Sequence, residues 1–118
     1  MPQLIACLST GKGTWGHVNH LIEKGEFDKV FLITNEFGRE NFTKTDKTEL
    51  IITDPNQGLN ELRDDIYKQL KEKKLETEIA LNLVSGSGKE HMALLSALLK
   101  LGVAIRLLAI TKEGVKEI

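Results

Sequence analysis

Residues 3–16 read QLIACLSTGKGTWG. The first part, residues 3–8, is apolar without strict alternation, which is typical of a strand buried on both faces of a parallel sheet. A loop of glycine and hydroxyl residues follows, and apolar residues then recur at helical spacing over residues 14–24, up to Gly25. This order predicts a strand, a glycine loop at its carboxyl end and a helix that returns across the sheet.

The remaining chain repeats this alternation of apolar runs and amphipathic segments. Apolar runs predict strands at residues 29–34, 50–53, 77–84 and 103–110. A short helix is predicted around residues 38–42, and a long helix is predicted to begin with Asp54 as its cap. A further helix is predicted at residues 89–101, where Gly102 ends it. We therefore expect a single α/β domain over residues 1–118. Its doubly wound, Rossmann-like parallel sheet has about five strands in the order 3-2-1-4-5, with helices on both faces.

The composition excludes several classes of protein. Sixteen Lys and Arg against seventeen Asp and Glu give a formal charge of −1, which argues against binding to duplex nucleic acid through many phosphate contacts. The single Cys7 lies in an apolar run and is expected to be a buried thiol in a reducing compartment, by default the cytoplasm. The N-terminus lacks the pattern of a secretory signal, and the apolar run at residues 92–99 is too short to span a membrane. We expect no targeting segment and no membrane association.

Two glycine loops are the candidate functional site. Residues 9–16 and 85–89 follow the first and fourth predicted strands, which the expected strand order places side by side where the winding of the chain reverses. Each loop combines glycines, hydroxyls and a lysine and precedes a helix N-terminus, a combination that favours a phosphate group. The alternative is that both are ordinary strand-to-helix turns. The candidate ligand-binding residues are Gly11, Lys12, Gly13, Thr14, Trp15, Thr34, Asn35, Glu36, Ser85, Gly86, Ser87 and Gly88.

Nucleotide-binding motifs give one open alternative and one exclusion. Residues 11–16 fit G-x-G-x-x-G, and Glu36, after the second predicted strand, could meet a ribose hydroxyl as in dinucleotide-binding folds. A dinucleotide-binding module therefore remains an alternative, although no substrate domain accompanies it. A phosphate-binding loop of the nucleoside triphosphatases is excluded, because Leu83 replaces its first glycine and Glu90 replaces its Ser or Thr.

The predicted helix at residues 89–101 carries apolar side chains on all sides. The sheet can cover only one side, so a second copy of the chain is expected to cover the other. A structural protein that binds another chain through this helix, with no ligand in the glycine loops, is a further alternative.

The segment IALNLVSGSGKEHMALLSALLKLG, residues 79–102, resembles the signature of the CRISPR-associated Rossmann-fold (CARF) domains. In that family a hydrophobic strand with a polar residue runs into a glycine-rich turn with a lysine, and a helix rich in Met, Ala and Leu follows. Here Ser87 separates the two glycines and Glu90 is an additional residue. The matching positions are Asn82, Gly86, Gly88, Lys89 and Met92.

The resemblance implies a homodimeric sensor of cyclic oligoadenylate, the ring-shaped second messenger of type III CRISPR defence, with no cofactor. We expect no effector domain of the kind that usually follows such a sensor, so a separate effector protein could be a partner. A stand-alone member could also be a ring nuclease, in which a ribose 2′-hydroxyl attacks the neighbouring phosphodiester without a metal. By this similarity Lys89 would stabilise the charge of the phosphorane, and Ser9 or Thr10 would position the linkage.

Three further groups of side chains have two readings each. His91 could act as an acid or base near neutral pH, or be a polar residue in an exposed helical turn. Trp15 could stack on an adenine or attach its loop to the predicted helix at residues 14–24. His17, His20 and Glu23 share one helical face, but nothing else in the chain completes a metal site, and we expect none.

Overall fold

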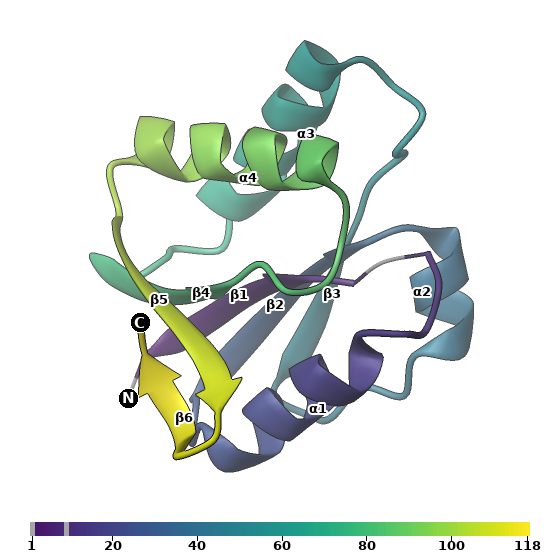
Figure 1. Ribbon diagram of the computed structural model, residues 1–118. Helices are drawn as coiled ribbons and strands as arrows, with labels where there is room; N and C mark the ends of the chain where they lie inside the picture. The colour runs from purple at the N-terminus through teal and green to yellow at the C-terminus, as the bar shows by residue number, and fades with distance from the viewer. Residues whose placement is uncertain (1, 9) are drawn as a thin grey trace.

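The computed structural model describes residues 2–8 and 10–118, in which a six-stranded sheet is flanked by four helices (Figure 1). The strands are β1 (Gln3–Cys7), β2 (Lys29–Thr34), β3 (Thr48–Ile52), β4 (Glu78–Asn82), β5 (Ala104–Thr111) and β6 (Gly114–Glu117). The helices are α1 (Trp15–Lys24), α2 (Glu36–Asn41), α3 (Leu59–Lys71) and α4 (Gly88–Leu101).

The order of the strands in the sheet is β3-β2-β1-β4-β5-β6. β1 lies in the centre, because Leu4 is opposite Val30 of β2 on one side and Ala80 of β4 on the other, both in parallel. The predicted order of the first five strands is therefore confirmed. Right-handed crossovers from β1 to β2 and from β4 to β5 run in opposite directions, so the chain reverses its winding between β1 and β4.

The sixth strand corrects the expectation of five. β6 runs antiparallel to β5, with Thr111 opposite Gly114 across a two-residue turn. Gly114 adopts φ +99°, a left-handed conformation that glycine enters without a steric penalty. Val115 is the apolar residue of β6 that packs toward the α1 side of the sheet, and one such residue gives no recognisable alternation in the sequence.

The helices cover both faces of the sheet, with α3 and α4 on one face and α1 and α2 on the other (Figure 1). Alternate residues of β1 divide between the two cores. Ile5 and Cys7 pack with α3 and α4, whereas Leu4, Ala6 and the following Leu8 pack with α1. A strand buried on both faces explains why the first apolar run has no polar alternation.

The start of α3 differs from the prediction. Asp54 does not cap a helix: its Oδ1 accepts a hydrogen bond of 2.9 Å from the Asn56 amide and forms a local turn, and α3 begins only at Leu59. Residues 53–58, which connect β3 to α3, are called the strap below. The short helix predicted around residues 38–42 is α2, which starts earlier because the Asn35 side chain caps it by accepting from the Gly38 amide.

The last helix, α4, ends at Gly102 as predicted, with this glycine at φ +77°. Its apolar residues are not all covered: Met92 is 61% exposed and Leu99 is 70% exposed. No helix in the described part of the chain is long and apolar enough to cross a bilayer.

Candidate functional site

The two glycine loops leave neighbouring strands. β1 and β4 pair in parallel up to Ala6 and Asn82, so the loops that follow them start at the same edge of the sheet. The β4–α4 loop then passes against the end of β1, since a Cβ on Gly86 would lie 2.8 Å from the Cβ of Cys7. Gly86 also has φ +103°, and the fold therefore needs a glycine at this position.

The other glycines of the two loops are not required by packing. A Cβ added to Gly11, Gly13, Gly16 or Gly88 would meet no described atom within 4 Å, and none of the four adopts a left-handed conformation. Gly16 is the second residue of α1 and Gly88 is the first residue of α4. Open space around glycines at helix N-termini allows a ligand to approach the backbone closely.

The N-termini of α1 and α4 differ in their capping. Thr14 precedes α1 without a capping hydrogen bond from its side chain to any described residue, and the first turn of α1 contains no acidic residue. At α4, the Ser87 hydroxyl accepts from the Glu90 amide at 3.2 Å, and the buried Glu90 carboxylate accepts from the Ser87 amide at 2.8 Å. An anion is therefore accommodated better at α1, where no carboxylate occupies the amino end.

This capping box was missed in the sequence analysis, although its signal is present. Ser87 and Glu90 satisfy the Ser-x-x-Glu pattern immediately before an apolar helix. Ser87, predicted as a ligand-binding residue, instead uses its hydroxyl to cap α4.

Trp15 anchors the β1–α1 loop to α2 and its end. The indole is 6% exposed and packs edge-on against Phe37 and Phe42, with ring centroids 5.8 and 5.5 Å apart. The Nζ of Lys12 lies 6.0 Å from the centre of the indole ring. The ring therefore attaches the loop to α2 and not, as the second reading had it, to α1, and its burial leaves little surface for stacking on a base.

Thr10 and Asn35 connect the loops after β1 and β2. The Asn35 Nδ2 donates to the Thr10 Oγ1 at 3.1 Å, while the Asn35 Oδ1 caps α2. Thr34 is buried, and its hydroxyl faces Gly38 without a hydrogen-bond partner in the described part of the chain. Ser9, the other predicted positioning residue, lies outside the described residues.

The predicted catalytic side chains on α4 both bond to the main chain. The Lys89 Nζ donates to the Pro55 carbonyl at 3.0 Å and also to the Gln57 carbonyl. The His91 Nε2 lies 2.8 Å from the Ser85 carbonyl, and because a carbonyl only accepts, this nitrogen carries a proton. The contacts of Lys12 and Lys89 thus lead to different partners: Lys12 lies over the Trp15 ring, and Lys89 reaches the strap.

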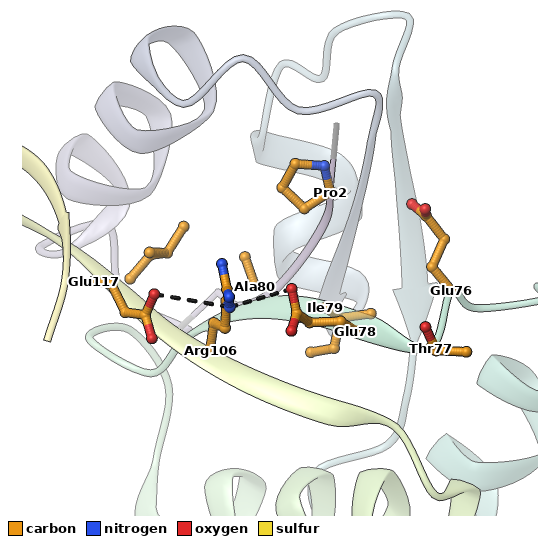
Figure 2. A pocket seen from close by; sticks show the side chains of 9 residues that line it. Pro2, Glu76, Thr77, Glu78, Ile79, Ala80, Arg106 and Glu117 are labelled. Carbon is orange, nitrogen blue, oxygen red and sulfur yellow. Dashed lines mark ion pairs between the residues drawn. The ribbon is translucent and has the colours of Figure 1, made fainter.

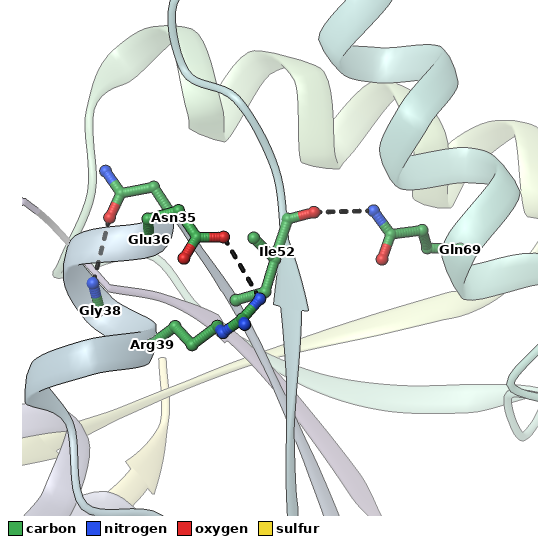
Figure 3. A network of polar contacts seen from close by, with 6 residues as sticks. All are labelled: Asn35, Glu36, Gly38, Arg39, Ile52 and Gln69. Carbon is green, nitrogen blue, oxygen red and sulfur yellow. Dashed lines mark hydrogen bonds and ion pairs between the residues drawn. The ribbon is translucent and has the colours of Figure 1, made fainter.

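A pocket of about 470 Å³ lies between the start of α2 and the strap. Glu36, Asp54 and Asp65 give it three carboxylates, and the residues that line it, all described, include no Lys, Arg or His. Figure 3 shows the neighbouring contacts, in which Glu36 pairs with Arg39 at 3.3 Å and the Gln69 amide donates to the Ile52 carbonyl at 3.0 Å. The pocket offers hydrogen-bond acceptors and disfavours a phosphate group.

A second pocket lies at the opposite end of β4. It measures about 330 Å³, and the Arg106 Nε lies between the carboxylates of Glu78, at 3.2 Å, and Glu117, at 3.8 Å (Figure 2). Glu78 is the first residue of β4, whereas the glycine loop follows the last, so this pocket is separate from the candidate site.

Cys7 is held in the interior of the site, and His17 is half-buried beside it. Burial, and to a smaller extent the charge of Glu90, raise the pKa of the Cys7 thiol, which therefore stays protonated. The His17 Nε2 is occupied by the Asn82 side chain at 3.2 Å. Within residues 2–8 and 10–118, no three His, Cys, Asp or Glu side chains are grouped so that they could hold a metal ion.

Comparison with known proteins gives no further assignment: no protein-family model matches the chain, and no curated protein matches it.

Proposed function

We propose that this chain, a CARF-like protein, binds cyclic oligoadenylate at the carboxyl end of its sheet. The observation that carries the proposal is that two glycine loops leave the paired strands β1 and β4, and that four of their glycines stand where the fold needs none. Such glycines allow phosphates to approach main-chain amides. The N-terminus of α1, which the Thr14 side chain does not cap among the described residues, and the exposed Lys12 add a positive field to the same loop.

The nucleoside parts of the ring have a separate place in this proposal. The pocket between α2 and the strap presents carboxylates to the hydroxyl and amino groups of an adenosine, and its volume lies within the range of small-molecule sites, about 300–1,000 Å³. Its rim is adjacent to the β1–α1 loop through the hydrogen bond between Asn35 and Thr10. A phosphate on the loop and a nucleoside in the pocket would therefore lie side by side.

The proposed ligand has a symmetry that a dimer can match. A ring of repeating adenylates has rotational symmetry, and a two-fold homodimer would present two copies of the site to it. Met92 and Leu99 form an exposed apolar side of α4 that a second copy could bury. We place the protein in the cytoplasm, where a separate effector protein could respond to the same messenger.

Cleavage of the ring is the more demanding part of the proposal. A 2′-hydroxyl loses its proton and attacks the adjacent phosphorus, a 2′,3′-cyclic phosphate forms, and the 5′-oxygen leaves and takes up a proton. Thr10 or Ser9 would position the linkage and Lys89 would stabilise the charge, while His91 would accept the proton of the 2′-hydroxyl and return a proton to the leaving 5′-oxygen. Lys89 must first leave the strap carbonyls to reach a phosphate.

Binding and cleavage are tested together. Cyclic tetra-adenylate and cyclic hexa-adenylate are titrated by calorimetry, and the incubated samples are then separated by chromatography. Lys12→Ala and Lys89→Ala should each weaken binding at least about tenfold, or abolish turnover. Lys24→Ala, an exposed lysine at the other end of α1, is the matched control and should bind normally. Absence of binding refutes the proposal, and binding without a linear product limits it to a receptor.

A dinucleotide-binding module remains the second candidate, because Glu36 lines the pocket beside the end of β2, where a ribose hydroxyl would be recognised. NAD, NADP and FAD should then raise the melting temperature, and Glu36→Ala should reduce the shift. If none of the three stabilises the protein, this candidate is removed.

A further inference from the structure

The strap is held from outside by a single side chain of α4. Its residues from Asp54 to Gly58 are exposed or half-buried, and the Lys89 Nζ bonds to two of its carbonyls, those of Pro55 and Gln57. A weaker contact joins the Gln57 side chain to Asp65 of α3 at 3.3 Å. Thr53, the first residue of the strap, is held separately, because its amide and its hydroxyl both donate to the Thr34 carbonyl. The turn at residues 54–58 is otherwise local, so Lys89 provides its connection to α4.

A bound anion would compete with the strap carbonyls for the Lys89 ammonium group. Its ammonium group has three donors on a flexible four-carbon stem, and the strap supplies only neutral carbonyls. The bonds of the ammonium to these carbonyls are already charge-assisted, but a phosphate adds a full opposite charge, so a phosphate at the glycine loops competes well for the ammonium. The Glu90 carboxylate already accepts from the Ser87 amide at the amino end of α4. The Lys89 side chain is therefore the group on this turn that can bind an anion.

The strap is also one wall of the acidic pocket. Asp54, Pro55 and Asn56 line the pocket, and the carbonyls of Pro55 and Gln57 bond to Lys89. Loss of the Lys89 bonds therefore frees the same segment that shapes the pocket. A change in the contacts of Lys89, at the amino end of α4, therefore reaches the wall of the acidic pocket.

We propose that Lys89 is a latch that holds the strap against α4, and that an anion bound at the glycine loops takes Lys89 and releases the strap. Anion binding and opening of the pocket are then coupled, and the coupling is reciprocal. The identity of the anion rests on the proposed function, with the phosphates of cyclic oligoadenylate as the occupant. The latch itself does not depend on that identity.

Hydrogen exchange of the ligand-free protein tests the latch first. Lys89→Met keeps the apolar stem and removes the ammonium, so exchange of the strap amides of residues 54 and 56–58 should become at least about tenfold faster. Lys100→Met, at the exposed last turn of the same helix, is the control and should leave the strap unchanged. Unchanged exchange in α3 shows that the fold is intact. Strap exchange that is equally slow in Lys89→Met and in the native protein overturns the latch.

Addition of cyclic tetra-adenylate or cyclic hexa-adenylate tests the coupling. In the native protein, saturation with the ring should raise strap exchange toward the level of Lys89→Met, and the variant should show no further increase. A ring that binds by calorimetry while strap exchange stays slow overturns the coupling but leaves the proposed function standing. Failure of both rings to bind overturns the proposed function and the coupling with it, whereas the latch is decided by the ligand-free comparison alone.

Discussion

The Asn82 Nδ2 lies 3.2 Å from the His17 Nε2 and joins the centre of the sheet to α1. The same amide nitrogen donates to the Leu108 carbonyl of β5 at 2.8 Å, and the Asn82 Oδ1 accepts from the Val84 amide at 3.2 Å. These partners fix the orientation of the amide, because a carbonyl can only accept and an N–H can only donate. The buried polar residue of β4 is therefore a tie between β4, β5 and α1.

Asn82→Leu should lower the free energy of unfolding by about 1–3 kcal/mol. The variant keeps a similar volume and leaves the Leu108 carbonyl and the Val84 amide without this partner. Urea denaturation measures the loss. Asn41→Leu is the control, because Asn41 also donates to a backbone carbonyl, that of Phe37, but is exposed, and its loss should stay below about 0.5 kcal/mol. Equal losses in the two variants would contradict the prediction, because burial of the Asn82 hydrogen bonds would then add nothing to their contribution to stability.

Gly86→Ala should destabilise the protein by about 2 kcal/mol or more. The new methyl group would lie too close to the Cβ of Cys7, and alanine is strained at φ +103°. Gly88→Ala, two residues later, meets no described atom and gains helix propensity, so its stability should be equal or slightly higher. The paired melting curves check the prediction, and similar curves for both variants would contradict it.

The Cys7 thiol should not react with a disulfide reagent in the folded protein. Burial raises its pKa, and the thiolate is the reactive form. The release of the chromophore from Ellman's reagent at pH 8 measures the reaction: it should be as slow as unfolding in buffer and complete in seconds to minutes in urea. Rapid labelling of the native protein would mean that the end of β1 opens to solvent.

Glu49→Gln should reduce stability at neutral pH but not at acidic pH. The hydrogen bond from Lys73, and then the charges of Lys73 and Lys29, hold the pKa of the Glu49 carboxyl below its ordinary value. A carboxyl with a lowered pKa in the folded state stabilises the fold above the unfolded pKa, about 4.3, and loses this contribution as the pH falls through the folded value.

Urea unfolding from pH 7 to pH 3 measures this difference. Glu49 is partly exposed, so the loss at pH 7 should not exceed about 1 kcal/mol. Glu72→Gln, at an exposed carboxylate after α3, serves as the control and should show little dependence on pH. A difference for Glu49→Gln that persists at pH 3 would show that packing and not charge is responsible.

Most of the fold could be predicted from the apolar runs of the sequence. Residues 29–34 are a strand with the predicted bounds, because a central strand must be apolar on both faces and this pattern is visible locally. The predicted order of the first five strands also holds, since the handedness of the crossovers leaves few arrangements. β6 was missed because an edge strand with a single packed residue, Val115, has no periodic signal.

The strap shows the limit of local signals. Asp54 and Pro55 have the chemistry of a helix start, but in a helix the Pro55 carbonyl would bond to an amide of the next turn. It bonds instead to Lys89, which lies 34 residues away in the sequence. A capping pattern does not reveal a competing partner from another element.

The amino-acid sequence by itself determined the α/β class, the order of five strands and the edge of the sheet where both glycine loops emerge, because these follow from residue periodicity and chain handedness. The tertiary structure alone decided where side chains with distant partners point: Lys89 toward the strap, Trp15 into a cluster of aromatic rings and Asn82 toward His17. A backbone path is set by many small local preferences. The partner of one long or polar side chain depends on which group from a distant segment comes within about 3 Å, and only the packed molecule specifies that distance.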